Sequence, residues 1–173
     1  MALLGAVNVG GRKVTAARMR AAAEDLGYQQ VASYVTSGNL VLVTSHAVAT
    51  VERELSKALS DEHGFDVPVL ARTSARWDAI VAGLPFEAQA RDDPSHLVVY
   101  CWDGAVGSTS FDPSPYGAEQ VVWAGHECYA YYPDGIGRSK LTLPVLKKAT
   151  GRAGTARNWN TVLALARLAR ERA

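Results

Sequence analysis

The sequence predicts an α+β fold made of tandem ferredoxin-like units, each with the split βαβ order and an antiparallel sheet, followed by a C-terminal helix. Short apolar stretches with strand composition alternate with stretches whose apolar residues recur every three or four positions. The order strand, helix, strand, strand, helix, strand fills the first half, and a looser copy follows in the second. We expect units at residues 1–86, with an extra helix, and 95–173, within one compact protein.

The first strand, helix and hairpin come early in the chain. An apolar strand at 2–7 leads into Asn8-Val9-Gly10-Gly11, which forms a turn because neighbouring glycines adopt positive φ at little steric cost. A helix follows. The residues on its inward face are Met19, Ala22 or Ala23, and Leu26. Strands at 31–36 and 39–43 flank Ser37-Gly38 and should pair antiparallel around this tight turn.

A second helix and a fourth strand complete the first unit. Ser45 can cap this helix, and a short strand at 67–70 follows it. Its buried face consists of Val48, Val51, Leu55 and Leu59. The extra helix of this unit is capped by Thr73 or Ser74 and stopped by Pro85. Its inward residues are Trp77, Ile80 and Val81.

The second half begins after a polar stretch at 87–95, which lacks periodicity and contains a turn signal. The strands expected beyond it lie at 97–102, 121–123 and 128–132. A helix matching the first helix of the chain would fall at 104–117, but Ser, Pro and Gly are frequent there, which weakens the copy. The remaining helices are expected at 143–149 and 161–172. Asn158 or Asn160 caps the last one.

The composition is that of a soluble globular protein. Of its 173 residues, 48% are hydrophobic and 20% are charged, and the mean hydropathy is −0.04. No segment approaches the roughly 20 apolar residues of a membrane span, so we expect no membrane partner. The start of the chain lacks a basic segment ahead of a long apolar one, which predicts no signal peptide and a cytoplasmic location. The sequence leaves the oligomeric state open.

The cysteines and histidines predict neither a disulfide nor a metal site. Cys101 and Cys128 lie in apolar stretches, where free buried thiols are the expected state in a reducing compartment. The four histidines, at 46, 63, 96 and 126, have no spacing typical of a zinc or iron site. We therefore expect no metal and no cofactor.

Charge is distributed unevenly along the chain, although the formal net charge is only +1. Residues 136–173 hold nine of the eighteen Lys and Arg residues but one of the seventeen acidic residues. Such a basic segment either docks on the more acidic remainder or receives an anionic ligand. A pI near 7.8 argues against strong nonspecific binding to nucleic acid. Nucleic acid is thus a less favoured partner than an anionic small molecule.

Three loops place glycines beside basic side chains. They are Gly10-Gly11-Arg12-Lys13, Gly135-Ile136-Gly137-Arg138-Ser139-Lys140 and Gly151-Arg152-Ala153-Gly154-Thr155-Ala156-Arg157. Glycine lets successive backbone N–H groups point into one concavity, and a helix start with a nearby cation completes a cradle for phosphate or carboxylate. No loop has the spacing of a nucleotide-binding fingerprint, so nucleotide triphosphate hydrolysis is unsupported. A purely structural role is the alternative for each loop.

The string Arg157-Asn158-Trp159-Asn160-Thr161 is the densest polar cluster. Its guanidinium, amides and indole can hold a ligand by bidentate contact and stacking. Alternatively, one asparagine caps the last helix, Trp159 packs inside, and Arg157 pairs with an acid from the first 135 residues. Aromatic residues that could stack on bases are Tyr34, Trp123, Tyr129 and Tyr131, on expected strands.

Five short blocks of the sequence form a recognisable pattern. The blocks are Ala2-Leu3-Leu4, Asn8-Val9-Gly10-Gly11, Ser37-Gly38-Asn39, Asp134-Gly135-Ile136-Gly137-Arg138-Ser139-Lys140-Leu141 and Gly154-Thr155-Ala156-Arg157-Asn158-Trp159-Asn160-Thr161-Val162. Together they resemble the signature of the bacterial domain-of-unknown-function family numbered 1697. The resemblance implies an α/β fold of sheets and helices in a stand-alone cytoplasmic protein, and the family has no established activity to lend.

The chain departs from that pattern at three positions. The family usually has an arginine and a glycine where this chain has Gly5 and Ala6, and a methionine where it has Ala16. If the arginine serves a ligand in the family, its role is lost or altered here.

The candidate ligand-binding residues combine these loops and blocks. They are Asn8, Gly10, Gly11, Ser37, Asn39, Arg138, Ser139, Lys140, Arg157, Asn158 and Asn160. Our first hypothesis is a binding module whose loops form one polar groove for a phosphate-bearing or other anionic ligand. The second is an enzyme acting on an anionic small molecule, with Asp134 as acid or base, although no motif identifies a catalytic residue. The third gives the basic C-terminal segment a purely structural role.

Overall fold

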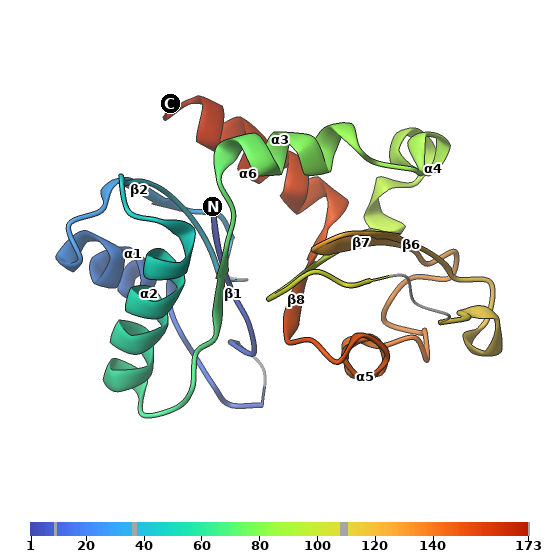
Figure 1. The fold of residues 1–173 in the computed structure, drawn as a ribbon, viewed down its shortest axis with the longest axis horizontal. Helices are drawn as coiled ribbons and strands as arrows, with labels where there is room; N and C mark the ends of the chain where they lie inside the picture. Colours follow the sequence, from blue (N-terminus) through green and yellow to red (C-terminus); the bar gives the residue numbers. More distant parts are fainter. Residues whose placement is uncertain (9, 36–37, 108–110, 173) are drawn as a thin grey trace. The chain divides into compact units, whose positions relative to one another are not determined.

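The protein is described by a computed structural model that covers residues 1–8, 10–35, 38–107 and 111–172 (Figure 1). The chain forms two compact units, Met1–Ala79 with Ala164–Ala173, and Ile80–Leu163. The limits between the units fall within helices α3 (Ser74–Ala82) and α6 (Trp159–Arg170). None of the helices among the described residues combines the length and the apolar character that a membrane span requires.

The first unit has the order of strands and helices that the sequence predicts. Its elements are β1 (Ala2–Leu4), α1 (Ala16–Asp25), β2 (Gln29–Ser33), β3 (Asn39–Val43), α2 (Val48–His63) and β4 (Val69–Ala71). The strands pair antiparallel in the order β2-β3-β1-β4, with Ala2 opposite both Leu40 and Ala71. This is the ferredoxin-like arrangement.

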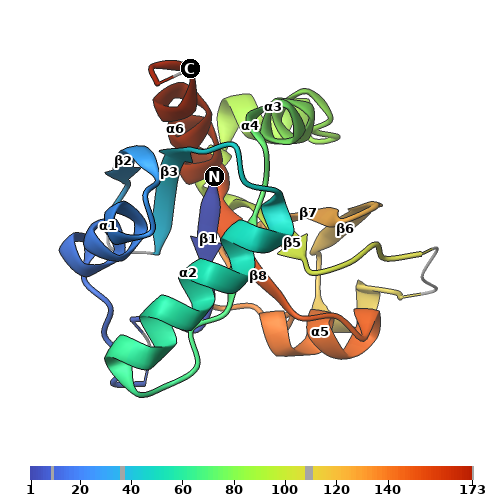
Figure 2. The same cartoon turned by 60° about the vertical axis from the view of Figure 1, so that its left-hand side comes forward.

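Helices α1 and α2 cover one face of this sheet (Figure 2). Their buried residues have helical spacing and are Met19, Ala22 and Ala23 on α1 and Val51, Leu55 and Leu59 on α2. These side chains pack against Leu4, Leu40 and Val69 of the strands. The core of the unit therefore lies between the two helices and the sheet, as their apolar stripes predict.

The second unit repeats the strand order with different connections. Its elements are α4 (Glu87–Asp92), the short 3-10 helix η1 (Pro94–His96), β5 (Leu97–Trp102), a second 3-10 helix η2 (Ser114–Tyr116), β6 (Gln120–Ala124), β7 (Glu127–Tyr131), α5 (Leu143–Thr150) and β8 (Gly154–Asn158). The strands pair antiparallel in the order β6-β7-β5-β8. When β5 to β8 are matched with β1 to β4, the two orders are identical. The chain is thus an α+β protein with two ferredoxin-like sheets.

One face of the second sheet is covered by α5 and by residues 103–107 and 111–119, which we call the aromatic segment. Its Phe111 ring stacks on Tyr116 with centroids 5.8 Å apart and meets Trp123 edge-on at 6.1 Å. The centroid of the Trp123 ring lies in turn 6.4 Å from that of the buried Trp102 ring. Among its described residues this segment forms no α-helix, in keeping with its Ser, Pro and Gly content.

Two segments differ from the sequence prediction in secondary structure. The polar stretch 87–95 contains α4 and η1 rather than irregular chain, because good helix formers such as Glu87, Ala88 and Gln89 form a helix without a buried face. The third glycine-basic loop was also predicted wrongly, since its second half is strand β8. Pairing with the apolar strand β5 creates this strand, although the sequence of β8 is itself polar.

Several element limits also differ. β1 ends at Leu4 because the next cross-strand partner, Pro68, accepts from the Gly5 amide at 2.8 Å but has no N–H to donate in return, and because Ala6 adopts a φ of 53°, which turns the chain. Ala47, not Ser45, precedes α2, and its side chain makes no capping hydrogen bond.

Candidate functional site

Two of the family-like blocks meet at one end of the first sheet. β1 and β3 pair with Leu3 opposite Asn39, so the segment after β1 and the loop before β3 lie at the same end. The Leu4 amide donates to the Gly38 carbonyl at 2.8 Å. A Cβ on Gly38 would lie 2.8 Å from the Leu4 Cβ, so this approach requires glycine. The predicted site residue Ser37 lies outside the described residues.

Two asparagines from these blocks hold the loops in shape. Asn8 donates its backbone N–H to the Arg12 carbonyl at 2.6 Å, and its Oδ1 accepts from the Val14 amide at 3.2 Å. Asn39 is fully buried, and its Nδ2 donates to the Tyr34 carbonyl at 3.1 Å. Both side chains therefore bind backbone groups of their own unit.

Left-handed backbone conformations recur in the same loops, and those of Ala6 and Val35 are the unfavourable ones among them. The φ angle is positive at Ala6 (53°), Asn8 (58°), Gly10 (58°), Gly11 (83°) and Val35 (48°). The left-handed region is costly for alanine and for a β-branched residue such as valine. Ala6 stands where the family pattern usually has glycine, the residue that this backbone favours. Such a concentration of strain is typical of binding and catalytic sites.

This end of the unit contains a cavity of about 490 Å³, which we call the α1 pocket. It is lined by Asn8, Gly11, Arg12, Lys13, Val14, Thr15 and Ala16. Two of these described lining residues are basic and none is acidic. The carbon of the Arg12 guanidinium lies 5.6 Å from the centroid of the Phe65 ring, a cation–π contact within the same unit.

The start of α1 adds backbone donors to the pocket. Thr15 caps the helix, because its hydroxyl accepts from the Arg18 amide at 3.3 Å and its carbonyl from the Met19 amide at 3.0 Å. The amides of Ala16 and Ala17, in the first turn, have no acceptor within the helix. The first turn contains no acidic residue. Free N–H groups and the helix dipole therefore present partial positive charge beside Arg12 and Lys13.

A second cavity, in the other unit, contains the predicted residues Arg138, Ser139 and Lys140. This Ser139 pocket has a volume of about 580 Å³ and is also lined by Asp134 and Glu119. The Ser139 hydroxyl donates to a carboxylate oxygen of Glu119 and accepts from the Leu141 amide at 2.9 Å. Its lining thus holds charges of both signs.

The remaining predicted residues are part of β8 and the start of α6. Arg157 is only 7% exposed and donates to the Thr155 hydroxyl at 2.8 Å and the Ala156 carbonyl at 2.7 Å. Burial lowers the pKa of its guanidinium to about 10, so the group stays protonated at neutral pH. Asn158 accepts from the Asn160 amide at 2.8 Å, which makes Asn158 the residue that caps α6.

The predicted site residues belong to two different units. Asn8, Gly10, Gly11 and Asn39 are in the first unit, and Arg138, Ser139, Lys140, Arg157, Asn158 and Asn160 are in the second. Within the second unit, Arg157, Asn158 and Asn160 are not among the residues that line the Ser139 pocket. The first unit brings together the α1 pocket residues, and the second brings together the Arg138 loop.

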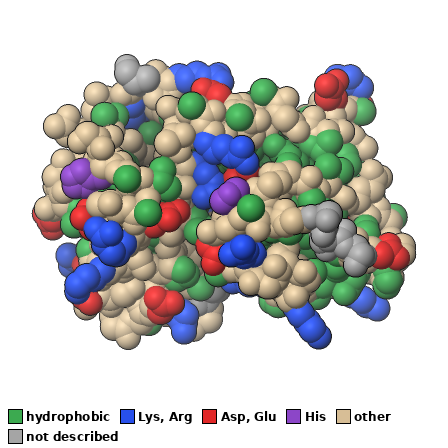
Figure 3. Space-filling view, viewed as in Figure 1, with side chains coloured by type: hydrophobic (Ala, Val, Ile, Leu, Met, Phe, Trp, Pro, Cys, Tyr) green, Lys and Arg blue, Asp and Glu red, His purple; other side chains and the backbone are tan. Residues whose placement is uncertain are grey.

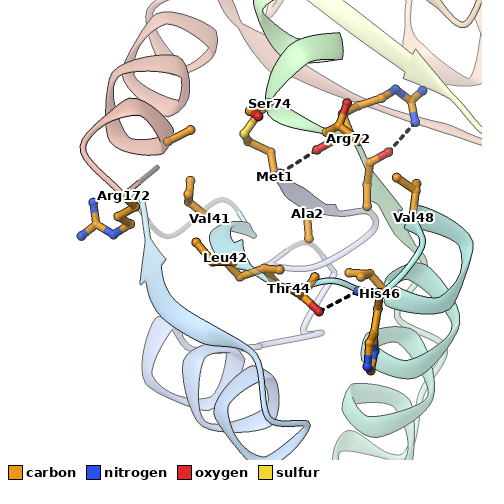
Figure 4. Close-up of a pocket in the computed structure, with 15 residues that line it drawn as sticks. Met1, Ala2, Val41, Leu42, Thr44, His46, Val48, Arg72, Ser74 and Arg172 are labelled. Carbon is orange, nitrogen blue, oxygen red and sulfur yellow. Dashed lines mark hydrogen bonds between the residues drawn. The ribbon is translucent and has the colours of Figure 1, made fainter.

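A third cavity has no sequence signal. This β3 pocket has a volume of about 300 Å³ and lies in the first unit, among residues that include Ala2, Val41, Leu42, Val48, Thr73 and Ala169 (Figure 4). Its apolar residues have the spacing of ordinary core positions. Nothing in the sequence pattern distinguishes a core residue that lines a cavity from one that fills it.

The aromatic residues proposed for base stacking are partly engaged in packing. Tyr129 is buried and donates to the Ile80 carbonyl at 2.8 Å, and Tyr131 donates to Asp93 at 3.0 Å. Figure 3 shows several Lys and Arg side chains beside acidic side chains on the face in view.

The two antiparallel sheets, one in each unit, and the basic pocket beside Gly10 and Gly11 define an α+β protein of two ferredoxin-like units. The chain belongs to the family described as "Protein of unknown function (DUF1697)", which matches residues 1–129. The first three sequence blocks lie within this match, and the blocks that begin at Asp134 and Gly154 lie beyond it.

Among solved structures, the conserved bacterial protein SP0830 from Streptococcus pneumoniae is similar, with a TM-score of 0.70 and 19% sequence identity over 98% of this chain and 96% of that chain. At this identity the likeness concerns the fold. The search of curated proteins found no match to this chain. No activity is assigned by these comparisons.

Proposed function

We propose that this protein binds a phosphate-bearing or other anionic small molecule in the α1 pocket. One observation carries the proposal. The Gly10-Gly11-Arg12-Lys13 loop leads into the uncapped amides of Ala16 and Ala17, and none of the described residues that line the cavity is acidic. Backbone donors, a helix start and two cations that converge on one cavity are the elements of an anion cradle.

The electrostatics of the pocket favour an occupant of negative charge. Neither Arg12 nor Lys13 forms an ion pair with another described residue. Basic groups beside a helix N-terminus are unfavourable by about 0.3–1 kcal/mol each, because they face the positive end of the helix dipole. A bound anion offsets this cost and interacts with both cations.

The Ser139 pocket is a weaker candidate for the same ligand. Glu119 and Asp134 line it together with Arg138 and Lys140, so an anion would meet two carboxylates as well as two cations. Repulsion from the carboxylates opposes the attraction of the basic groups. We therefore assign the anionic ligand to the α1 pocket.

We further propose a cytoplasmic location. Cys101 and Cys128 are buried cysteines that form no disulfide. Free thiols are the usual state in a reducing compartment, which supports this location.

The test is a titration of the ¹⁵N-labelled full chain with inorganic phosphate and inorganic pyrophosphate, followed by amide NMR shifts at two salt concentrations. We expect saturable shifts at Gly10, Gly11, Ala16 and Ala17, with weaker binding at higher salt. The variant Lys13→Gln should bind pyrophosphate several-fold more weakly.

The matched control is Lys57→Gln, because Lys57 is an exposed lysine of the same unit whose ammonium pairs with Asp61 outside the pocket. Its affinity for pyrophosphate should equal that of the unmodified protein. An equal loss of pyrophosphate affinity in both variants would show that binding depends only on the net charge of the protein. The absence of saturable shifts at the α1 pocket would refute the proposal.

A further inference from the structure

The β3 pocket is an apolar cavity formed by distant segments of the first unit. β1, β3, the start of α2, the turn after β4 and the end of α6 all contribute to it. Nine of its fifteen lining residues are apolar, and Ala2, Val41, Val51 and Ala71 among them are less than 5% exposed. The volume of about 300 Å³ is at the lower end of the range of small-molecule sites.

The basic side chains of this pocket lie at its periphery. In Figure 4, Met1, Ala2, Val41 and Leu42 occupy the middle of the view, whereas the heads of Arg72, Arg172 and His46 extend outward on different sides. The cavity is therefore polar around its edge and apolar inside, apart from the Met1 amino group, which donates to the Arg72 carbonyl at 2.7 Å. Burial lowers the pKa of this amino group to about 6, so it is largely uncharged at neutral pH.

Each of these basic groups already has an acceptor within the unit. Arg72 donates to the Ala71 carbonyl at 2.8 Å, and Arg172 to the Leu168 carbonyl at 3.2 Å, with Glu171 3.8 Å away. His46 Nδ1 lies 3.3 Å from a carboxylate oxygen of Glu54.

The polar edge also includes hydroxyl groups that are engaged. The Thr44 hydroxyl accepts from the His46 amide at 3.1 Å, and the Thr73 hydroxyl accepts from the Arg76 amide at 3.1 Å. A charged ligand would lose its hydration on entering the cavity. Because these polar groups already bind other groups of the protein, the ligand would gain few hydrogen bonds in return, and the cost in free energy is high. An uncharged apolar ligand loses little favourable hydration and gains contact with the apolar walls.

We propose that the β3 pocket binds a small uncharged apolar molecule, such as a compound with a single aromatic ring. This site is separate from the α1 pocket, because no residue lines both cavities. The proposal therefore stands whether or not an anion binds at α1.

Three probes of similar size test the proposal: benzyl alcohol, benzoate and benzylamine, each titrated into the ¹⁵N-labelled full chain. We expect benzyl alcohol to cause saturable amide shifts at Leu42, Val48 and Ala169, and both charged probes to bind at least tenfold more weakly. Benzoate binding as tight as benzyl alcohol would overturn the proposal, because the basic edge would then select the ligand. No saturable shift with benzyl alcohol would overturn it as well.

A pair of substitutions locates the binding. Ala169→Phe fills the cavity from α6, and Ala21→Phe places the same side chain at a half-buried position of α1 that does not line it. The first should weaken benzyl alcohol binding at least tenfold, and the second should leave it within twofold. Val43→Phe, at a lining residue that is 38% exposed, replaces the first variant if that variant does not fold. Unchanged binding in the cavity-filling variant would exclude this site.

Discussion

The two units share one strand order but cover their sheets differently. In the first unit, α1 and α2 cover one face of the sheet. In the second, α5 corresponds to α2, while the aromatic segment occupies the place of α1 in the chain order. The ferredoxin-like sheet thus requires an apolar cover, but that cover does not have to be helical.

The two covers also differ in how deeply their residues are buried. Met19 and Ala23 of α1 are 0% exposed, whereas Phe111 and Tyr116 of the aromatic segment are only partly buried. The helix presents several apolar groups to the sheet, whereas the segment presents the Phe111 ring, which packs on Trp123, and the Tyr116 ring, which stacks on Phe111. We therefore expect the helix to contribute more stability per residue.

The largest expected effect compares the two covers directly. Met19→Ala should lower the free energy of unfolding by about 2–5 kcal/mol, because it leaves a cavity under α1. Phe111→Ala should lower it by only about 1–2 kcal/mol, because its ring is partly exposed. Urea denaturation measures both. Ile136→Ala, at a residue that is 46% exposed, serves as the control and should change little. Equal losses for Met19→Ala and Phe111→Ala would mean that the aromatic segment is as important as the helix.

A glycine beneath the aromatic cluster should show a somewhat smaller effect. A Cβ on Gly154 of β8 would lie 2.3 Å from an indole carbon of Trp102, which is fully buried, and 2.8 Å from the backbone carbonyl oxygen of Cys101. Gly154→Ala should therefore lower the free energy of unfolding by about 1–3 kcal/mol through overpacking. In Gly107→Ala the new Cβ meets no atom within 4 Å, so its thermal unfolding should match that of the unmodified protein. A stable Gly154→Ala variant would show that the indole can shift.

The smallest expected effect compares two helix starts. Thr15→Ala removes the hydroxyl that accepts from the Arg18 amide at the start of α1 and should cost about 1 kcal/mol. Thr142 occupies the same position before α5 but makes no side-chain capping bond, so Thr142→Ala should cost much less. Chemical denaturation distinguishes the two. Equal losses in the free energy of unfolding would show that the Thr15 hydroxyl contributes no more to stability than the Thr142 hydroxyl, which makes no capping bond.

The fold class could be predicted because the two halves follow the same order of periodic segments. The four strands of the first unit and its two covering helices have clear apolar patterns, and glycines mark their ends. β8 could not be found in this way, because Thr155, Arg157 and Asn158 are polar and their strand conformation depends on pairing with β5. Pairing with a distant strand is not visible in a local pattern.

The candidate site could be predicted only in part, for a similar reason. The Gly10-Gly11-Arg12-Lys13 loop was identified from residue types alone, since glycines and cations beside a helix start have a local meaning. The burial of Asn39 and Arg157 depends on the folded surroundings, and so do the walls of the β3 pocket. Residue types alone therefore indicate this loop as a candidate site. They do not indicate which of the other polar residues are exposed to solvent.

The aromatic segment also affects how this chain can change in length. One residue inserted into α1 would rotate every later side chain by about 100° and turn Met19 out of the core. An insertion between Val106 and Gly107 leaves the helices and strands in register, and doubling the length of a flexible loop costs only about 0.6 kcal/mol. This position of the second unit is therefore a better place than α1 for the insertion of a peptide tag.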